Sequence, residues 1–401
     1  MVRLDDYRHI VGDEQISAIF RQARRLYGKR VIHVNSTYMG GGVAEMLQSL
    51  VPLMNDAGVK ADWRILRGSP DFFDITKKFH NGLQGEEINL SEIKKSIYEQ
   101  INEEFARYAD LNHDTVIIHD PQPLPLIRYY NKKQPWIWRG HIDLSSPHAG
   151  LWEYLKSFIL RYDMVIVSNQ EYKKADLPVA HRIFTPVIDP LSPKNRPLTA
   201  HNMNRYLKKY NIPTDKPLIT QISRFDKWKD PLGVLDVFKR VREKTDCRLV
   251  LCGSMASDDP EGIQIYETVE REAGGLLKKQ EVILLTTENN FLVNMLQRVS
   301  AVILQKSLRE GFGLTVTEAL WKARPVVASQ VGGIPLQIKS GETGFLLNPE
   351  DNEGFSEAVL YCLRNPQKAV RMGRKGRQAV QQNFLITRLL YDYLQLLTEM
   401  I

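Results

Sequence analysis

The chain has 401 residues, of which 43% are hydrophobic and 25% charged, and its formal net charge is +7. This length favours two domains, because a single hydrophobic core stops growing at about 250–300 residues. Basic and acidic residues are interspersed, which disfavours a nucleic-acid partner. The three cysteines are too few and too irregularly spaced for a disulfide framework or a zinc site.

The amino-terminal residues are charged and lack an apolar signal core. No apolar run along the chain reaches the roughly 18 residues of a membrane span. We therefore expect a cytoplasmic protein that has no membrane partner.

Short apolar runs alternate with longer amphipathic segments throughout the chain. In the first half, the expected strands are 30–37, 61–66, 115–120, 135–140, 163–168 and 181–186. In the second half, they are 217–223, 247–253, 281–286, 301–305, 324–329 and 344–348. Strands that alternate with helices predict parallel sheets covered on both faces.

Residues 186–202 contain four prolines within twelve positions and are typical of a linker. The expected fold class is α/β, with two doubly wound, Rossmann-like domains that face each other across a cleft. We assign residues 1–190 to the first domain and 191–379 to the second. The last segment, about residues 380–401, should form an amphipathic helix that can pack on either half, and we assign it to the first.

The first motif is "NSTYMGGGVAEML", in which Gly40, Gly41 and Gly42 follow a strand and open a helix. Glycines there let backbone N–H groups approach a ligand, and the helix N-terminus favours an anion. A dinucleotide fingerprint needs a third glycine where Glu45 stands, which disfavours a nicotinamide dehydrogenase. The alternative is a purely structural tight turn.

The second motif is "ISRFDKWKDP", in which Arg224 and Lys229 follow the first strand of the second half. Two cations at a strand end suit a diphosphate, since arginine offers a bidentate fork and lysine a point charge. The alternative is a pair of ordinary surface charges.

The third motif is "LREGFGLTVTEALW", in which we expect Glu310 at the end of a strand and a helix that starts near Leu314. The glycine loop and the helix N-terminus can receive a phosphate. Glu318 then lies about one turn into the helix, so that the two carboxylates flank the phosphate. This arrangement suits a nucleotide sugar, whereas the alternative is two surface glutamates at helical spacing.

These motifs carry a family resemblance. "EGFGLTVTEALWKARPVVASQVGGIPLQI" resembles the signature of retaining GT-B glycosyltransferases of the glycogen-synthase and sucrose-synthase type. "VNSTYMGGGVAEML", "HDPQPLPLI" and "WRGHIDLSSP" are similar to the archaeal trehalose glycosyltransferring synthases and to the related trehalose phosphorylases. The matching segments occur in order across nearly the whole chain.

The resemblance implies roles for individual residues. Arg224 and Lys229 would bind the diphosphate and stabilise the leaving-group charge, and His119 would lie near the reacting sugar; with Glu310 these form the expected catalytic set. The acceptor-binding residues would be Asn35, Tyr38, His141 and Asp143, although a strand-end histidine can also be a simple capping group. The donor-binding residues would be Gly41, Gly42, Glu310, Gly311, Phe312, Gly313, Leu314, Thr315 and Glu318.

The resemblance implies a retaining glucosyltransferase that joins NDP-glucose to free glucose and gives α,α-trehalose. A homodimer is expected, although the sequence leaves the oligomeric state open. A trehalose phosphorylase, or a transferase with a sugar-phosphate acceptor held by Arg128 and Arg139, remains an alternative, as does a non-catalytic nucleotide-sugar-binding protein. No metal site is expected, because Asp258 and Asp259 are adjacent in a loop rather than in an Asp-x-Asp pattern. No cofactor is obligatory, and a divalent cation such as Mg²⁺ is expected at most to assist.

Overall fold

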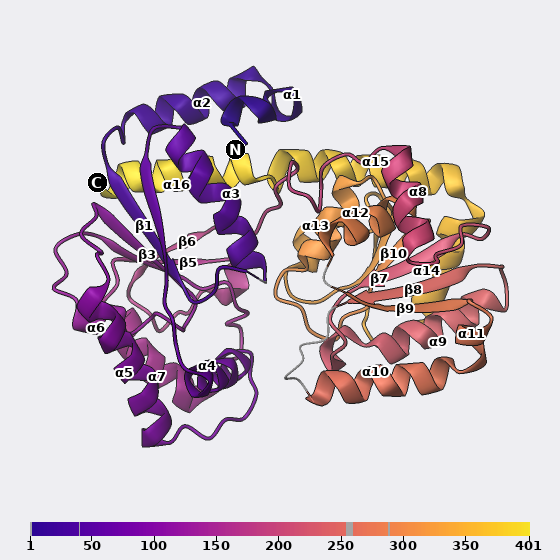
Figure 1. The fold of residues 1–401 in the computed structure, drawn as a ribbon, viewed down its shortest axis with the longest axis horizontal. Coiled ribbons are helices and arrows are strands. Elements are labelled where there is room, and N and C mark those ends of the chain that lie inside the picture. The colour runs from indigo at the N-terminus through magenta and orange to yellow at the C-terminus, as the bar shows by residue number, and fades with distance from the viewer. Residues whose placement is uncertain (1, 40, 254–259, 288) are drawn as a thin grey trace. The chain divides into compact units, whose positions relative to one another are not determined.

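The computed structural model describes the chain except for residues 1, 40, 254–259 and 288. The chain divides into two units (Figure 1): unit 1 contains Met1–Val187 and Ile386–Ile401, and unit 2 contains Ile188–Leu385. Each unit has one sheet, with six strands in its described residues. No helix within the described part of the chain has the length and apolar character needed to cross a membrane.

The sheet of unit 1 has the order β2-β1-β3-β4-β5-β6, and its strands are parallel. All six apolar runs of the first half form strands, as predicted. Their bounds are β1 Arg30–Asn35, β2 Lys60–Ile65, β3 Thr115–His119, β4 Trp136–Arg139, β5 Met164–Val167 and β6 Ala180–Ile183.

Helices cover this sheet, and several begin at side-chain caps; Ser69 and Ser91, for example, accept backbone hydrogen bonds at the starts of α4 and α5. The helices of unit 1 are α1 Arg8–Val11, α2 Asp13–Arg24, α3 Gly42–Asp56, α4 Pro70–Leu83, α5 Glu92–Tyr108, α6 Leu126–Tyr129, α7 Ala149–Ile159 and α16 Ile386–Met400, with 3₁₀ turns η1 Leu4–Tyr7 and η2 Gln170–Tyr172.

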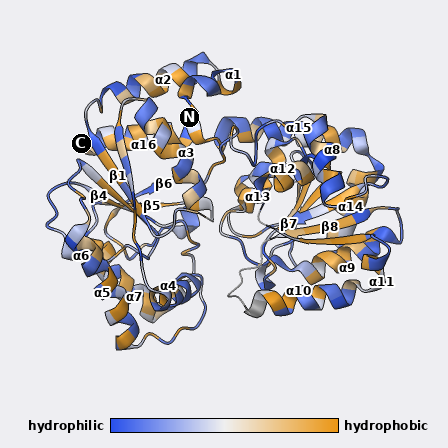
Figure 2. Ribbon diagram, viewed as in Figure 1, coloured by the Kyte–Doolittle hydropathy of each residue, from blue (hydrophilic) through white to orange (hydrophobic). Residues whose placement is uncertain are grey.

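Strands β1, β3, β4 and β5 are almost wholly buried, as the inner strands of a sheet covered on two sides must be. Ile32 and Val34 of β1 and Ile118 of β3 belong to a core that also contains Phe79 of α4 and Phe158 of α7. Figure 2 shows the apolar colour along much of the inner strands and a mixture of polar and apolar colours along the surrounding helices. Helix α16 contacts both α2 and α3.

The sheet of unit 2 has the order β12-β11-β10-β7-β8-β9, and its strands are also parallel. All six runs predicted in the second half form strands. The bounds are β7 Leu218–Ile222, β8 Arg248–Gly253, β9 Val282–Thr286, β10 Val302–Gln305, β11 Val326–Ser329 and β12 Phe345–Leu347.

Neighbouring residues of a strand in unit 2 point to opposite faces of the sheet and pack in two different hydrophobic cores. Leu218 and Ile222 of β7 pack with Leu296 of α12, whereas Ile219 of the same strand packs with Phe238 of α9. The helices are α8 Ala200–Lys209, α9 Pro231–Arg242, α10 Pro260–Ala273, α11 Gly275–Lys278, α12 Asn290–Val299, α13 Leu314–Trp321, α14 Asn352–Arg364 and α15 Pro366–Asn383, with 3₁₀ turns η3 Lys227–Lys229 and η4 Ile334–Leu336.

The two chain segments that lead into and out of unit 2 lie side by side. The backbone N–H of Ile188 donates to the carbonyl of Phe384 at 2.9 Å, and Ile188 forms a parallel bridge with Leu385. Unit 2 is therefore inserted between the larger part of unit 1 and α16.

Candidate functional site

The strand order of unit 2 places a ligand-binding position between β7 and β10. The chain runs outward from β7 through β8 and β9 on one side, and then returns to β10 on the other. In such sheets ligands bind beyond the carboxyl ends of the strands at this reversal, the topological switch point. The loops after β7 and β10 carry Lys229 and Glu310, two residues that the sequence selected.

Lys229 and Glu310 form an ion pair at this switch point. The Lys229 Nζ lies 2.7 Å from the Glu310 Oε2, and the two side chains are only 15% and 13% exposed. The expectation that Glu310 ends a strand was wrong, because β10 ends at Gln305 and the carboxylate reaches Lys229 from the loop that follows. This loop allows the Glu310 carboxylate to contact both Lys229 and Gln305.

Two buried glutamines support the pair, and sequence reasoning missed both. At the end of β10, Gln305 donates to the Glu310 Oε2 at 3.3 Å and accepts from the Thr315 hydroxyl at 2.8 Å. On β7, Gln221 donates to the Lys229 carbonyl at 2.8 Å and accepts from the Lys306 N–H at 3.0 Å. An uncharged polar residue in an otherwise apolar strand run was the available signal.

Arg309 and Trp228, the residues directly before Glu310 and Lys229, form a second contact between the same two loops. The Arg309 guanidinium lies 4.6 Å from the centre of the Trp228 ring, and the Leu308 N–H donates to the Trp228 carbonyl at 2.8 Å. Arg224 instead pairs with Asp226 at 3.1 Å and is 64% exposed. Arg224 is thus open to solvent, whereas Lys229 is enclosed.

The glycine loop after Glu310 ends at the N-terminus of α13, which begins at Leu314 as predicted. Gly313 has φ 80°, a left-handed conformation that favours glycine. Gly332, with φ 53°, packs so closely on this loop that a Cβ would lie 1.7 Å from the Glu310 carbonyl oxygen. Phe312 is buried against Phe384, so that only the backbone of this loop is suited to meet a ligand.

Glu318 lies one turn into α13 and is almost fully buried. Among the described residues, its carboxylate has only long contacts, to the Gln297 Nε2 at 3.4 Å and to the Lys194 Nζ at 3.6 Å. Beside it, the buried Lys322 Nζ donates to Asn195 at 2.8 Å, to Gln297 at 2.7 Å and to the Glu318 carbonyl at 3.2 Å. Burial lowers the pKa of Lys322, and the Glu318 charge opposes that shift.

The strand order of unit 1 has its own switch point, between β1 and β3. Asn35 ends β1, where its Oδ1 accepts from the Trp63 indole at 2.7 Å, and the exposed Tyr38 ring stacks on Trp63 at 5.0 Å. Gly41 has φ 81° and caps α3, which begins at Gly42. Gly40 lies outside the described residues.

Three histidines meet at this switch point. The Nδ1 of His33 on β1 lies 2.9 Å from the Nε2 of His119 at the end of β3. The Nδ1 of His119 lies 2.9 Å from the Nε2 of His141. Burial lowers the pKa of all three, and that of His33 falls to about 3. Both ring nitrogens of His119 are therefore occupied by other histidines, and His119 is buried.

Asp120 follows His119, and sequence reasoning did not select it. It has φ 61°, a strained conformation for a residue other than glycine, and its Oδ1 accepts from the His141 N–H at 2.8 Å. Burial raises the pKa of its carboxyl to about 7, although the His141 N–H and Arg139 oppose the shift. A partly exposed residue whose carboxyl has such a pKa is a functional-site candidate. Asp143, nearby in sequence, accepts from the Ser145 N–H at 2.8 Å.

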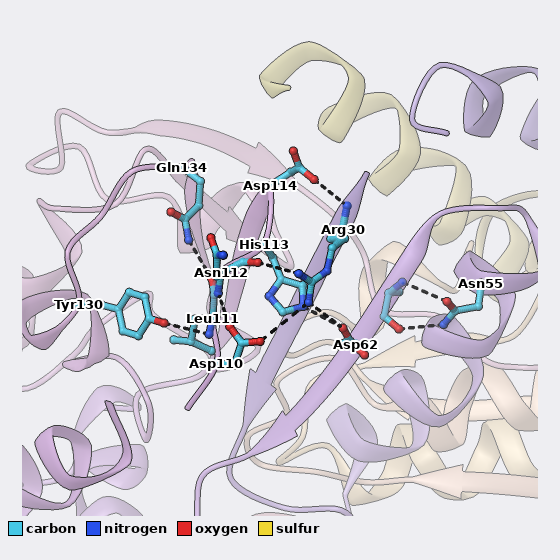
Figure 3. Close-up of polar contacts among 11 residues, drawn as sticks. Arg30, Asn55, Asp62, Asp110, Leu111, Asn112, His113, Asp114, Tyr130 and Gln134 are labelled. Carbon is cyan, nitrogen blue, oxygen red and sulfur yellow. Dashed lines mark hydrogen bonds and ion pairs between the residues drawn. The ribbon is translucent and has the colours of Figure 1, made fainter. Parts of the chain in front are cut away.

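A second polar cluster in unit 1 lies at the opposite, amino-terminal ends of the strands (Figure 3). The His113 Nε2 lies 2.8 Å from Asp62 of β2, and Asp114 accepts from the Arg30 N–H at the start of β1 at 2.8 Å. These contacts tie three neighbouring strands together. Because ligands bind at the carboxyl ends, we assign this cluster a structural role.

Two family models match the chain, one within each unit. Residues 33–174 match the family described as "Trehalose synthase, N-terminal domain", and residues 202–379 match "Glycosyl transferases group 1". Within the described residues, no cluster of three or more His, Cys, Asp or Glu side chains is arranged to hold a metal ion. Asp258 and Asp259 lie outside the described residues.

The solved structures that resemble the chain define the class of the fold. Sucrose-phosphate synthase from Thermosynechococcus elongatus has a TM-score of 0.72 at 16% identity, covering 92% of this chain and 98% of that one. A UDP-forming trehalose-phosphate synthase from Burkholderia xenovorans has a TM-score of 0.73 at 17% identity, covering 92% and 98%. The fold is therefore that of the GT-B glycosyltransferases.

Sequence relatives give the family. The "Trehalose synthase" of Thermococcus litoralis is 47% identical, and that of Rubrobacter xylanophilus 42% identical, each over 99% of this chain and 97% of the relative. A "Trehalose phosphorylase" of Pleurotus pulmonarius is 29% identical over 92% of this chain and 57% of its own length. The chain belongs to the trehalose synthase family and is a trehalose-related glycosyltransferase.

Proposed function

We propose that this protein transfers glucose from a nucleoside-diphosphate glucose to free D-glucose and releases α,α-trehalose and the nucleoside diphosphate. The observation that carries the proposal is the enclosed Lys229–Glu310 pair at the switch point of unit 2, beside the N-terminus of α13. The cation and the helix N-terminus suit a diphosphate, and the carboxylate suits sugar hydroxyls. Relatives named trehalose synthase support this choice of product.

In this proposal the donor lies along the loops after β7 and β10. Lys229 and the exposed Arg224 neutralise the diphosphate, and the backbone of residues 311–315 contacts the phosphates and the sugar. Glu310 accepts hydrogen bonds from the glucose hydroxyls. Glu318, whose long contacts leave its oxygens with spare capacity, accepts them from the ribose hydroxyls.

The proposed reaction retains the configuration at the anomeric carbon. The acceptor hydroxyl attacks glucose C1 on the face from which the phosphate leaves, the C1–O bond to the diphosphate breaks, and the hydroxyl proton passes to a phosphate oxygen. Negative charge builds up on the departing diphosphate, where the Lys229 ammonium is already in place. No covalent enzyme intermediate and no metal ion are needed in this scheme.

We place the acceptor sugar at the switch point of unit 1, next to Asp120, His141, Asp143, Asn35 and Tyr38. A free sugar is favoured over a sugar phosphate as the acceptor, because the two arginines that could bind a phosphate already have partners within the protein. Arg128 pairs with Glu99 at 2.5 Å, and Arg139 is 1% exposed and bonded to Tyr393. Neither arginine is placed to receive a phosphate without losing these partners.

A trehalose phosphorylase is the second candidate, favoured by the relatives of that name. Phosphate would then replace the nucleoside diphosphate, and Glu318 would have no ribose to bind.

The test is to incubate the protein with UDP-, ADP- or GDP-glucose together with glucose, glucose 6-phosphate or phosphate. Proton NMR identifies the sugar product, and chromatography identifies the released nucleotide. Trehalose and NDP formed only with free glucose support the proposal, and a Glu310→Ala protein should then lose most of the activity. Glucose 1-phosphate formed from trehalose and phosphate, with no NDP-glucose consumed, would establish the phosphorylase instead.

A further inference from the structure

A buried polar chain in unit 1 joins strands β1, β3 and β4 to helix α16. It runs from His33 through His119 to His141, with 2.9 Å between nitrogens at each step. Arg139 continues it, since its Nε lies 3.5 Å from the His141 Nδ1 and its Nη1 donates to the Tyr393 hydroxyl at 2.9 Å. The imidazole planes are inclined by only 28° and 18°, which keeps the hydrogen bonds near the ring planes.

The Arg139 guanidinium determines the direction in which hydrogen bonds are donated along this polar chain. Arginine has donors and no acceptor, so that the His141 Nδ1 facing it must carry a lone pair. The proton of neutral His141 is then on Nε2, from which it is donated to the His119 Nδ1. The same reasoning puts the proton of His119 on Nε2, donating to the His33 Nδ1.

The chain ends on a buried donor. The His33 Nε2 has no hydrogen-bond partner among the described residues. The His33 ring meets the Tyr393 ring edge to face, with 5.7 Å between centroids and 81° between planes. Tyr393 therefore contacts both ends of the chain, through its hydroxyl at Arg139 and through its ring at His33.

We infer that Arg139 and Tyr393 are positioning residues that hold His33, His119 and His141 in one tautomeric order, with every proton on Nε2. His119 then acts neither as a base nor as a sugar ligand, since both of its nitrogens are used within the chain. The same contacts use both nitrogens of His141, so that what the chain positions is Asp120, whose Oδ1 accepts from the His141 backbone N–H at 2.8 Å. The effect on the acceptor sugar rests on the proposed function, whereas the tautomeric order does not.

The depressed pKa values of the three imidazoles support this order, because a neutral ring has one proton to place. These pKa values do not show in which direction the three imidazoles donate their hydrogen bonds. The Arg139 guanidinium does, because it can only donate. A glutamine at position 139 could accept as well as donate, and would permit either direction.

The first test reads the tautomers directly. Two-bond proton–nitrogen NMR correlations of the full-length protein, labelled at its nine histidines, are assigned with single His→Gln variants at 33, 119 and 141. All three rings are expected as neutral Nε2–H tautomers at pH 7, with a second set of signals in Arg139→Gln. An Nδ1–H form of His119 or His141 in the unmodified protein would overturn the inference.

The second test compares Tyr393→Phe with Tyr391→Phe, where Tyr391 is a partly buried tyrosine on the same helix. Tyr393→Phe removes an acceptor from a buried cation, so that KM for the acceptor sugar should rise about tenfold. The dissociation constant of the nucleoside diphosphate, measured by calorimetry, should stay unchanged, as should both quantities in Tyr391→Phe. Equal kinetics in the two variants would refute the positioning role. Lack of turnover by the unmodified protein would instead refute the proposed function, and the NMR test would still decide the tautomers.

Discussion

Gly332 controls the position of the carboxylate at the centre of the candidate site. A side chain at this position would collide with the backbone carbonyl of Glu310. Gly341 offers a matched comparison, since its φ of 79° is also left-handed and a Cβ added there would have no heavy atom within 4 Å.

We expect Gly332→Ala to lower kcat/KM about 100-fold, because a displacement of about 1 Å at a reacting group can cost that much. Gly341→Ala should leave kcat/KM near that of the unmodified protein, although both variants carry the backbone strain of a left-handed alanine. Steady-state kinetics and melting temperatures of the two variants give the comparison. Equal losses of activity would show that strain, rather than displacement of Glu310, is responsible.

His33 should make unit 1 sensitive to acid. Its pKa is about 3 in the folded protein and about 6.5 when unfolded, so that between these values only the unfolded chain binds the proton. Its contribution to the free energy of unfolding is therefore complete above pH 6.5 and decreases as the pH falls, by at most about 1.4 kcal/mol per pH unit.

The measurement is urea unfolding at pH 7.5, 6.0 and 5.0 of the unmodified protein, of His33→Asn and of His9→Asn. The exposed His9 serves as the control. The stability difference between unmodified protein and His33→Asn should shrink toward low pH, whereas that for His9→Asn should stay constant. A difference for His33→Asn that does not change with pH would contradict the prediction.

At the residue scale, sequence patterns identified single candidate residues of the site more readily than the residues that these contact in the fold. Lys229 and Glu310 were selected separately, and their 2.7 Å contact depends on a loop path that no local pattern encodes. Gln305 and Asp120 were missed for the same reason, since their importance comes from what the fold brings beside them. The roles assigned to the site residues stay predictions.

At the scale of elements, α16 illustrates how strongly packing decides stability. Its Leu394 is fully buried, whereas the adjacent Gln395 is exposed. Leu394→Ala should lower the free energy of unfolding by about 2–5 kcal/mol, the usual cost of truncating a buried leucine. Gln395→Ala should change it by less than about 0.5 kcal/mol. Chemical denaturation checks both values, and similar small effects would mean that α16 is loosely attached.

The strands were predictable because each is a short apolar run in a sheet that is covered on both faces, and all twelve predicted runs form strands. The start of α13 was predictable from the glycines before Leu314. The order of the strands was not, because a parallel sheet is built from long-range pairings. That order, in turn, defines the two switch points.

At the scale of the whole molecule, each unit has its own switch point, and we have assigned donor and acceptor to different units. Glu318→Gln should therefore weaken nucleoside-diphosphate binding about tenfold or more, the worth of hydrogen bonds to a charged group. Asp120→Asn should leave that affinity unchanged and raise KM for the acceptor sugar. Calorimetry and steady-state kinetics on both variants test this division, which fails if Asp120→Asn weakens nucleotide binding.

The insertion of unit 2 within unit 1 has a consequence for synthesis on the ribosome. All of Ile188–Leu385 leaves the ribosome before α16 does, so that unit 2 can fold while unit 1 still lacks a helix. Until then, the surfaces of α2 and α3 that contact α16 are uncovered, and Arg139 has no Tyr393 hydroxyl to bind. Unit 1 is thus the last part of the molecule to be completed, although most of its residues are the first to be made.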